Sequence, residues 1–117
     1  MLYFAYGSNL NRKQMESRCP GSKYIKNYYL KGYKLCFSWN KYRGDRNGVA
    51  NIKKQNNPTK YMLYTVPGAI YEINNKHRNK LRNSEGYPLV YDENFFTLDK
   101  KKVFFYIMKN CDPKRPT

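Results

Sequence analysis

Hydrophobic residues occur along this chain in short runs and alternating patterns, separated by polar stretches rich in glycine, asparagine and proline. Short runs that contain many aromatic or β-branched residues favour β-strands. We therefore expect strands at residues 2–6, 30–39, 49–53, 61–73, 89–98 and 103–108. Within residues 61–73 we expect a bulge or an edge position at Pro67-Gly68, because proline lacks the N–H that a sheet interior needs.

Two short helices are expected between these strands. One runs from an asparagine cap at Asn9 or Asn11 to about Arg18, and the other covers residues 74–83. Residues 84–88 form a loop after the second helix. Five or six short strands with two helices indicate an α+β domain built on a curved sheet or small barrel.

Length and composition limit the class of protein to which this chain can belong. The chain has 117 residues, which is enough for a single domain with one hydrophobic core. Its content of 40% hydrophobic residues argues against a disordered segment. No apolar run approaches the roughly 20 residues that a membrane-spanning helix needs. The N-terminus has no basic region before its short apolar run, so we expect no signal peptide.

The charge balance is the unusual feature of the composition. Lys and Arg number 23 against 8 Asp and Glu, for a net charge of +15. Such an excess is typical of proteins that bind polyanions. However, the basic residues are spread along the chain, and its richness in Lys, Asn and Tyr is also what AT-rich coding DNA produces. A basic module that binds RNA or another polyanion is therefore an alternative, while nucleic acid is not the favoured partner.

The cysteines and the single histidine exclude several kinds of site. Cys19, Cys36 and Cys111 form no CxxC pair, so we expect free thiols in a reducing, cytoplasmic compartment. His77 lies in a polar stretch that predicts an exposed helix face. We therefore expect no zinc site and no nucleophile that depends on a histidine base. The proton carrier of any reaction would be a carboxylate.

The junction at residues 6–10 is the first feature that can carry chemistry. A strand, a glycine and the start of a helix follow one another there. The free N–H groups of a helix start bind a carboxylate, a phosphate or a developing oxyanion. The same sequence also fits an ordinary turn with an asparagine cap.

Glu85 is the second such feature, a carboxylate near Tyr87 and Tyr91. It fits a general base whose pKa is raised by burial, and it also fits a loop glutamate that pairs with a lysine. Lys80 and Arg82 lie nearby in the sequence and would lower its pKa.

The segment Tyr3-Phe4-Ala5-Tyr6-Gly7-Ser8-Asn9-Leu10 resembles the opening signature of the γ-glutamylcyclotransferase (AIG2-like) family. Further matches follow in the family's order along most of the chain. They are Met15, Arg18 and Pro20 around the first helix, the segments 30–35, 48–52 and 66–73, and the turn 81–86 with its Glu-Gly pair.

The resemblance implies a small mixed β-barrel of five or six strands flanked by short helices. It also implies an enzyme that needs no metal or cofactor. The α-amino group of a γ-glutamyl amide or dipeptide attacks its own γ-carbonyl, which yields 5-oxoproline and a free amine or amino acid. By the same resemblance Glu85 is the base. The implied substrate contacts are Tyr3, Phe4, Ala5, Tyr6, Gly7, Ser8, Asn9 and Leu10, with aromatic support from Tyr91 and Tyr106.

The sequence departs from the family pattern at three places. Arg82 stands where the family often has Asp, and Pro67 replaces a residue that is often aromatic or polar. The family pattern also continues with a tyrosine and a final helix, so we expect residues 1–117 to be one domain that lacks this C-terminal segment. A pseudo-enzyme that binds a small carboxylate is a further alternative. The γ-glutamyl substrate and the oligomeric state stay open.

Overall fold

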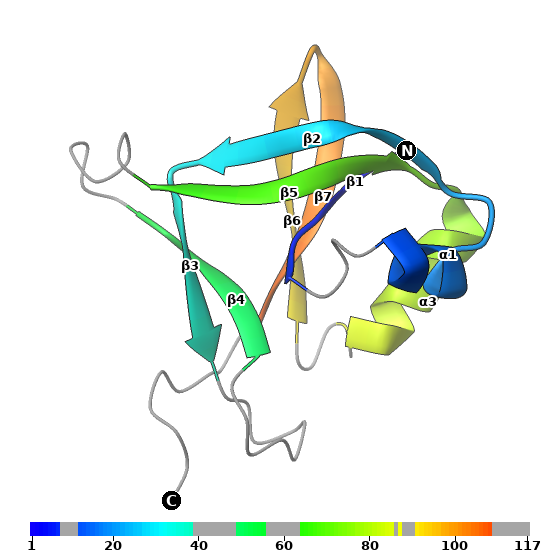
Figure 1. Cartoon of the computed structure of the whole chain (residues 1–117), viewed down its shortest axis with the longest axis horizontal. Coiled ribbons are helices and arrows are strands. Elements are labelled where there is room, and N and C mark those ends of the chain that lie inside the picture. Colours follow the sequence, from blue (N-terminus) through cyan, green and yellow to red (C-terminus); the bar gives the residue numbers. More distant parts are fainter. Residues whose placement is uncertain (8–11, 39–48, 56–63, 86, 88–90, 109–117) are drawn as a thin grey trace, which may run out of the picture.

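The computed structural model describes residues 1–7, 12–38, 49–55, 64–85, 87 and 91–108, and it confirms the α+β class (Figure 1). In chain order, the elements are β1 (Leu2–Ala5), α1 (Arg12–Arg18), β2 (Lys23–Lys31), β3 (Tyr33–Ser38), β4 (Val49–Lys54), β5 (Thr65–Glu72), α3 (Asn75–Glu85), β6 (Tyr91–Leu98) and β7 (Lys101–Met108). No helix among the described residues is long and apolar enough to cross a membrane.

Five strands form one sheet in the order β2-β5-β1-β7-β6, and β3 pairs with β4 in a separate antiparallel sheet. β1 is the central strand, antiparallel to β5 and parallel to β7. Because β2 and β6 are the two edges of the larger sheet, the described strands form an open sheet and a strand pair. The closed barrel of five or six strands that the resemblance implies is not formed by these residues.

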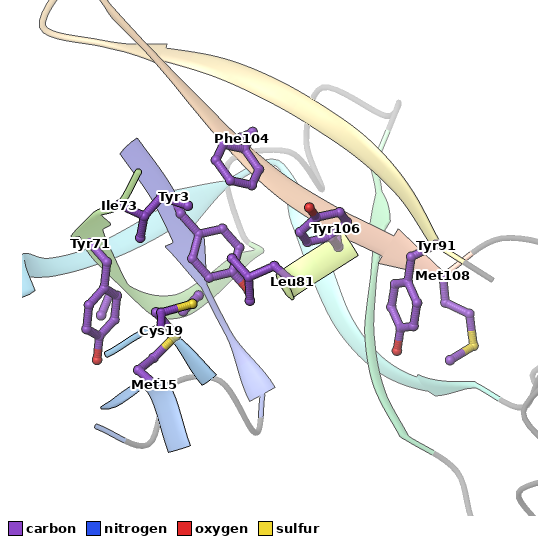
Figure 2. Close-up of a cluster of buried hydrophobic side chains, with 12 residues drawn as sticks. Tyr3, Met15, Cys19, Tyr71, Ile73, Leu81, Tyr91, Phe104, Tyr106 and Met108 are labelled. Carbon is purple, nitrogen blue, oxygen red and sulfur yellow. The ribbon is translucent and has the colours of Figure 1, made fainter. Parts of the chain in front are cut away.

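The two faces of the larger sheet contribute to two separate cores. Strand geometry sends successive side chains to opposite faces. Accordingly, Tyr3 and Ala5 of β1 enter one core, while Phe4 enters the other. The helix-side core contains Met15 of α1 and Leu81 of α3 and is drawn in Figure 2. The hairpin-side core lies between the sheet and the β3–β4 pair and contains Leu30, Ile52, Val66, Ile70, Val103 and Phe105.

The strand expected at residues 30–39 is the junction of two strands. β2 begins at Lys23 and ends at Lys31, and β3 begins at Tyr33. Gly32 separates them with a φ of +86°, a conformation that glycine adopts without strain. Because β2 is an edge strand, most of its side chains are exposed and its sequence shows no clear alternation of apolar residues. This is why most of β2 was not expected.

β5 is not interrupted at Pro67-Gly68, and of the two arrangements expected there Pro67 has the edge position. β5 is continuous and pairs with β2 along its whole length, with Pro67 opposite Tyr29. The β1 partners of β5 run only from Ala69 to Glu72. Among the described strands Pro67 therefore has a hydrogen-bonding neighbour on one side only, which is a position where a sheet tolerates proline.

Gly68 allows the central strands to pack closely. A Cβ atom on Gly68 would lie 2.5 Å from Cζ of Phe4 and 2.5 Å from the carbonyl oxygen of Ala5. Real Cβ atoms do not approach other atoms this closely, and one of the two contacts is to backbone. Any side chain at residue 68 would therefore displace β1, the strand that leads into the predicted anion-binding turn.

We expect Gly68→Ala to destabilise the fold by about 2 kcal/mol, because a close-packed core does not absorb an added methyl group without strain. A fall in the urea midpoint of unfolding would show this. Gly21→Ala is the comparison, since a Cβ there meets nothing within 4 Å and only its φ of +83° is unfavourable. Equal stability of the Gly68→Ala variant and the wild type would contradict the packing argument.

His77 is buried, with 7% of its surface exposed, which corrects the expected exposed position. Its Nδ1 accepts the backbone N–H of Asn74 at 3.2 Å, so Nε2 carries the proton and donates to the carbonyl oxygen of Pro20 at 2.6 Å. His77 and Leu81 are four residues apart in α3 and therefore share its inward face. The histidine thus joins α3 to the turn after α1, which is a structural role.

Cys19 lies in the helix-side core as a free thiol, as expected. Burial raises the pKa of this thiol, so it stays protonated and unreactive. Cys111 and the side chain of Cys36 are outside the described part of the chain.

Candidate functional site

The central strand β1 leads directly into the turn that the sequence singles out. Gly7 is exposed and has a φ of +66°, in the left-handed region that favours glycine. Tyr6 precedes it and is half-buried, and its hydroxyl donates to the carbonyl oxygen of Tyr106. This hydrogen bond ties the start of the turn to β7. Residues 8–10, which complete the predicted turn, lie outside the described residues.

The other members of the signature are enclosed by the two cores. Tyr3, Phe4 and Ala5 are all buried, with Tyr3 and Ala5 on the helix side of the sheet and Phe4 on the hairpin side. Tyr6 and Gly7 are therefore the described residues of the signature that reach the surface. Both faces of β1 are covered by a core, and Tyr6 and Gly7 lie beyond the end of the strand.

Tyr91 and Tyr106 are both buried in the helix-side core (Figure 2). Tyr106 lies beside the signature, because its ring centroid is 6.1 Å from that of Tyr3 and its carbonyl accepts the Tyr6 hydroxyl. Tyr91 is the first residue of β6, directly opposite Met108 of β7. The structure thus brings Tyr106 to the signature strand and places Tyr91 farther along the same core.

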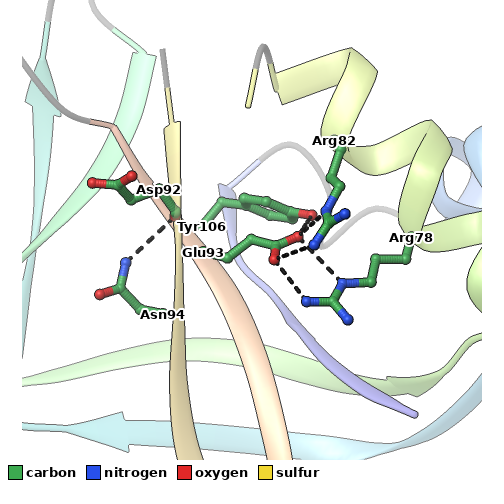
Figure 3. A network of polar contacts seen from close by, with 6 residues as sticks. All are labelled: Arg78, Arg82, Asp92, Glu93, Asn94 and Tyr106. Carbon is green, nitrogen blue, oxygen red and sulfur yellow. Dashed lines mark hydrogen bonds and ion pairs between the residues drawn. The ribbon is translucent and has the colours of Figure 1, made fainter. Parts of the chain in front are cut away.

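Glu93 is a buried carboxylate that the sequence did not single out. It faces Tyr106 across the β6–β7 pair, and the Tyr106 hydroxyl donates to its Oε2 at 2.7 Å. Arg78 and Arg82 of α3 also converge on it, with closest contacts of 2.7 Å each (Figure 3). The sequence does contain a signal for this cluster. Arg78 and Arg82 are four residues apart and share a helix face, and Glu93 lies two residues after Tyr91 on the same strand face.

The electrostatics of this cluster keep Glu93 ionised. Burial by itself would raise the pKa of its carboxyl, but the hydrogen bonds from Arg82, Arg78 and Tyr106 outweigh it and lower the pKa to about 2. Burial and the bond to Glu93 raise the pKa of Tyr106, so its hydroxyl remains a donor. A carboxylate held in this way does not take up a proton near neutral pH. Glu93 is therefore unsuited to the role of general base.

Glu85 is the last residue of α3 rather than a residue of the expected loop 84–88. Its side chain is outside the described part of the structure. The backbone places it three residues, or about one helical turn, after Arg82. The guanidinium of Arg82 is bound to Glu93 through Nε and Nη2 and lies over the ring of Tyr87. Its positive charge is thus partly compensated by Glu93, which weakens its effect on nearby carboxyl groups.

The carboxyl end of β1 is linked to α3 through Tyr106 and Glu93. The exposed Gly7 begins a turn whose backbone can approach a ligand closely, and Tyr106 connects this turn to the arginine cluster. The arginines supply positive charge beside the helix end that carries Glu85. This arrangement suits a small anionic substrate whose reaction needs a base and oxyanion stabilisation.

Comparison with known proteins finds no family model and no curated protein that matches the sequence. Solved structures do match. A γ-glutamyl cyclotransferase superposes with a TM-score of 0.75 at 24% identity, over 96% of this chain and 68% of that protein. An uncharacterised human protein gives a TM-score of 0.73 at 25% identity, over 95% of this chain and 68% of its own. The chain has the γ-glutamylcyclotransferase-like fold.

An uncharacterised protein from Pyrococcus horikoshii shares the γ-glutamylcyclotransferase-like fold more distantly, with a TM-score of 0.65 at 16% identity over 97% of this chain and 81% of that one. The family resemblance stated from the sequence is thus confirmed at the level of the fold. Nearly the whole chain takes part in each match, so the fold is not limited to the signature segment.

Proposed function

We propose that this protein is a γ-glutamyl cyclotransferase, which converts a γ-glutamyl amide or dipeptide to 5-oxoproline and a free amine or amino acid. The observation that carries the proposal is the location of the family signature. Its described part runs along β1, the central strand of a γ-glutamylcyclotransferase-like fold, and reaches the exposed Gly7. The hydrogen bond from Tyr6 to Tyr106 holds this end of the strand in place.

The reaction that we propose needs few groups from the protein. Glu85 takes a proton from the substrate's α-ammonium, and the resulting amine attacks the γ-carbonyl carbon to close a five-membered ring. N–H groups of the turn at residues 6–10 stabilise the oxyanion of the tetrahedral intermediate. The bond from this carbon to the leaving nitrogen then breaks as Glu85 returns its proton to that nitrogen. The ring nitrogen loses its second proton to become the lactam N–H, and the released amine takes up this proton as an ammonium ion. No water is consumed, and the substrate supplies its own nucleophile.

Geometry supplies much of the acceleration in such a ring closure. The α-amino group and the γ-carbonyl belong to one molecule, so a site that holds the glutamyl chain folded brings them to attack distance. Ordered neighbours favour this, and the described residues beside the end of β1 are joined by hydrogen bonds. Tyr6 is bound to β7, Tyr106 is bound to Glu93, and Glu93 is bound to α3.

A screen of γ-glutamyl compounds for release of 5-oxoproline tests the proposal. We expect turnover of at least one γ-glutamyl amino acid or amine, with 5-oxoproline and the free amine in equal amounts. The same compounds linked through the α-carboxyl are the control, because their α-nitrogen cannot form the five-membered lactam by attack at that carbon. Absence of turnover with measurable binding of 5-oxoproline would instead favour a pseudo-enzyme. Salt-sensitive RNA binding without turnover would favour a polyanion-binding module.

A further inference from the structure

A pocket of about 460 Å³ opens on the hairpin-side face of the larger sheet, where β1 begins. Its floor is apolar and is formed by Leu2 of β1, Ile70 of β5 and Leu98 at the end of β6. Ile70 belongs to the hairpin-side core, and Leu2 and Leu98 pack against that core. The volume lies within the range of small-molecule sites in proteins. The pocket can therefore hold a small ligand and offers it an apolar surface.

This pocket is separate from the candidate functional site. Figure 1 shows β1 running from the labelled N-terminus towards the lower part of the view. Leu2 lies at the pocket and Gly7 at the signature turn, and the rise of a strand puts about 16 Å between them. The residues that line the pocket do not include Tyr6, Gly7 or Tyr106. A ligand bound in the pocket would therefore not touch the groups assigned to the reaction.

A β-bulge in β2 turns two consecutive side chains towards the pocket. The register of β2 against β5 shifts between Tyr24 and Lys26, which makes Ile25 the extra residue of β2. In a regular strand, successive side chains point to opposite faces of the sheet. Here, both Ile25 and Lys26 line the pocket. The bulge thus places an apolar side chain and an ammonium group next to each other at the edge of the pocket.

The rim of the pocket has an excess of positive charge. Lys26 of β2 stands on one side of it and Lys101 and Lys102 of β7 on the other, together with the carboxylates of Glu72 and Asp99. All three lysines are exposed. Within the described part of the chain, none of the three forms an ion pair. Their ammonium groups are therefore available to an anion that enters the pocket.

The two carboxylates do not cancel this charge. Glu72 is directly opposite Lys23 in the register of the β2–β5 pair, and Asp99 is followed by three consecutive lysines, residues 100–102. With Lys23 included, four ammonium groups and two carboxylates surround the pocket, a sum of about +2 at neutral pH. The chain as a whole carries +15. Both the local and the overall field therefore favour a negatively charged ligand.

We propose that this pocket is a second binding site, which takes an amphipathic anion with one alkyl chain, such as a free fatty acid. The alkyl chain lies on Leu2, Ile70 and Leu98, and the carboxylate is bound by Lys26 and Lys101. The ligand is a free acid rather than a membrane lipid, because the volume of the pocket is that of one small molecule. This site is independent of the proposed cyclotransferase function, and none of its tests requires turnover.

Three small probes separate the apolar and the charged parts of the site in an NMR titration of the full chain at low salt. We expect octanoate to bind at least 10-fold more tightly than butanoate, since each buried CH₂ contributes about 4-fold. We expect it to bind about 3-fold more tightly than 1-octanol, which lacks the charge, and this difference should disappear in 0.5 M NaCl. The largest shift changes should occur at Leu2, Ile25 and Leu98.

Several results of this titration would overturn the proposal. Equal affinities for octanoate and 1-octanol would remove the carboxylate contact, and equal affinities for octanoate and butanoate would remove the apolar floor. Shift changes confined to Tyr6 and Gly7 would place the ligand in the candidate functional site instead. Binding to phosphatidylglycerol vesicles without binding of free octanoate would indicate a membrane-binding surface.

Ile25→Glu tests the location of the site at an exposed position. Ile25 is 47% exposed, so the fold should tolerate the change, while the new carboxylate repels the ligand and an apolar contact is lost. We expect the affinity for octanoate to fall by about 10-fold or more. Leu35→Glu is the matched control, because Leu35 is 41% exposed and lies on β3, outside the pocket. An equal loss in both variants would assign binding to the general field of the protein and overturn the site.

Lys26→Gln is a second variant that leaves the apolar lining intact. We expect it to lower the affinity for octanoate by about 3-fold and to leave the affinity for 1-octanol unchanged, because only the contact to the carboxylate is lost. Lys31→Gln removes an exposed positive charge from the same strand, outside the pocket, and should change neither affinity by more than about 2-fold. Equal effects of the two lysine substitutions on octanoate would overturn the proposed carboxylate contact.

Discussion

Replacing Glu85 with glutamine is expected to lower the rate of 5-oxoproline release by about 10²- to 10⁴-fold, the usual contribution of a general base. Glutamine has nearly the same size but cannot accept the proton of the substrate's α-ammonium. The amine that must attack the γ-carbonyl then stays protonated. Single-substrate kinetics with γ-glutamylalanine would measure the effect, and we expect kcat to fall much more than substrate affinity.

The fold should survive this change, which makes the experiment specific. Glu85 is the final residue of α3, and the helix is anchored independently by Leu81, His77 and the two arginines on Glu93. Glu16→Gln on the exposed face of α1 is the matched control and should keep full activity. If the Glu85→Gln variant were as active as this control, another group would have to be the base.

Replacing Glu93 with glutamine is expected to destabilise the protein by about 3 kcal/mol near pH 7, because two guanidinium groups and a buried hydroxyl lose their ionised partner. The magnitude follows from the pKa of Glu93, which falls from its usual 4.5 to about 2 in the folded protein. For a domain of this size, such a loss lowers Tm by roughly 10 °C.

The stabilisation by Glu93 should decrease as the pH falls. The folded state lowers the pKa of Glu93, so the stabilisation is complete above pH 4.5 and is lost as the pH falls towards about 2. Glutamine does not titrate, so the difference in stability between the wild type and Glu93→Gln should shrink over this window. Urea unfolding at pH 7, 4 and 3 would measure it. Glu72→Gln, at an exposed position on β5, should show little change, and a Glu93→Gln difference that is constant with pH would contradict the ion-pair account.

The strands that could be predicted are those whose apolar residues are also buried in the folded protein. The strand at residues 49–53 and the strand at residues 103–108 appear in the structure as β4 and β7 with shifts of one or two residues. Both are rich in apolar residues, and in β7 the side chains of residues 103–106 and of Met108 are buried. The signature segment likewise forms a strand followed by a glycine with positive φ.

The predictions that the structure corrects concern positions that depend on tertiary contacts rather than on neighbouring residues. β2 is polar because it is an edge strand, and edge position depends on the order of strands rather than on the sequence of β2 itself. His77 was expected to be exposed because its neighbours are polar, yet it shares the inward face of α3 with Leu81 and bonds to Pro20. The edge position expected at Pro67, by contrast, is found, because β1 ends before reaching it.

The sequence by itself determined the α+β class, the family-like signature along β1 and the two candidate features at residues 6–10 and Glu85. These are local properties, since they depend on residues that are neighbours in the chain. Only the tertiary structure decided which charges meet. It brought Arg78 and Arg82 of α3 onto Glu93 of β6, 11 residues after Arg82 in the chain, and tied Tyr6 to Tyr106, 100 residues away. Pairings of this kind depend on strand order and helix packing, and they set the ionisation of Glu93.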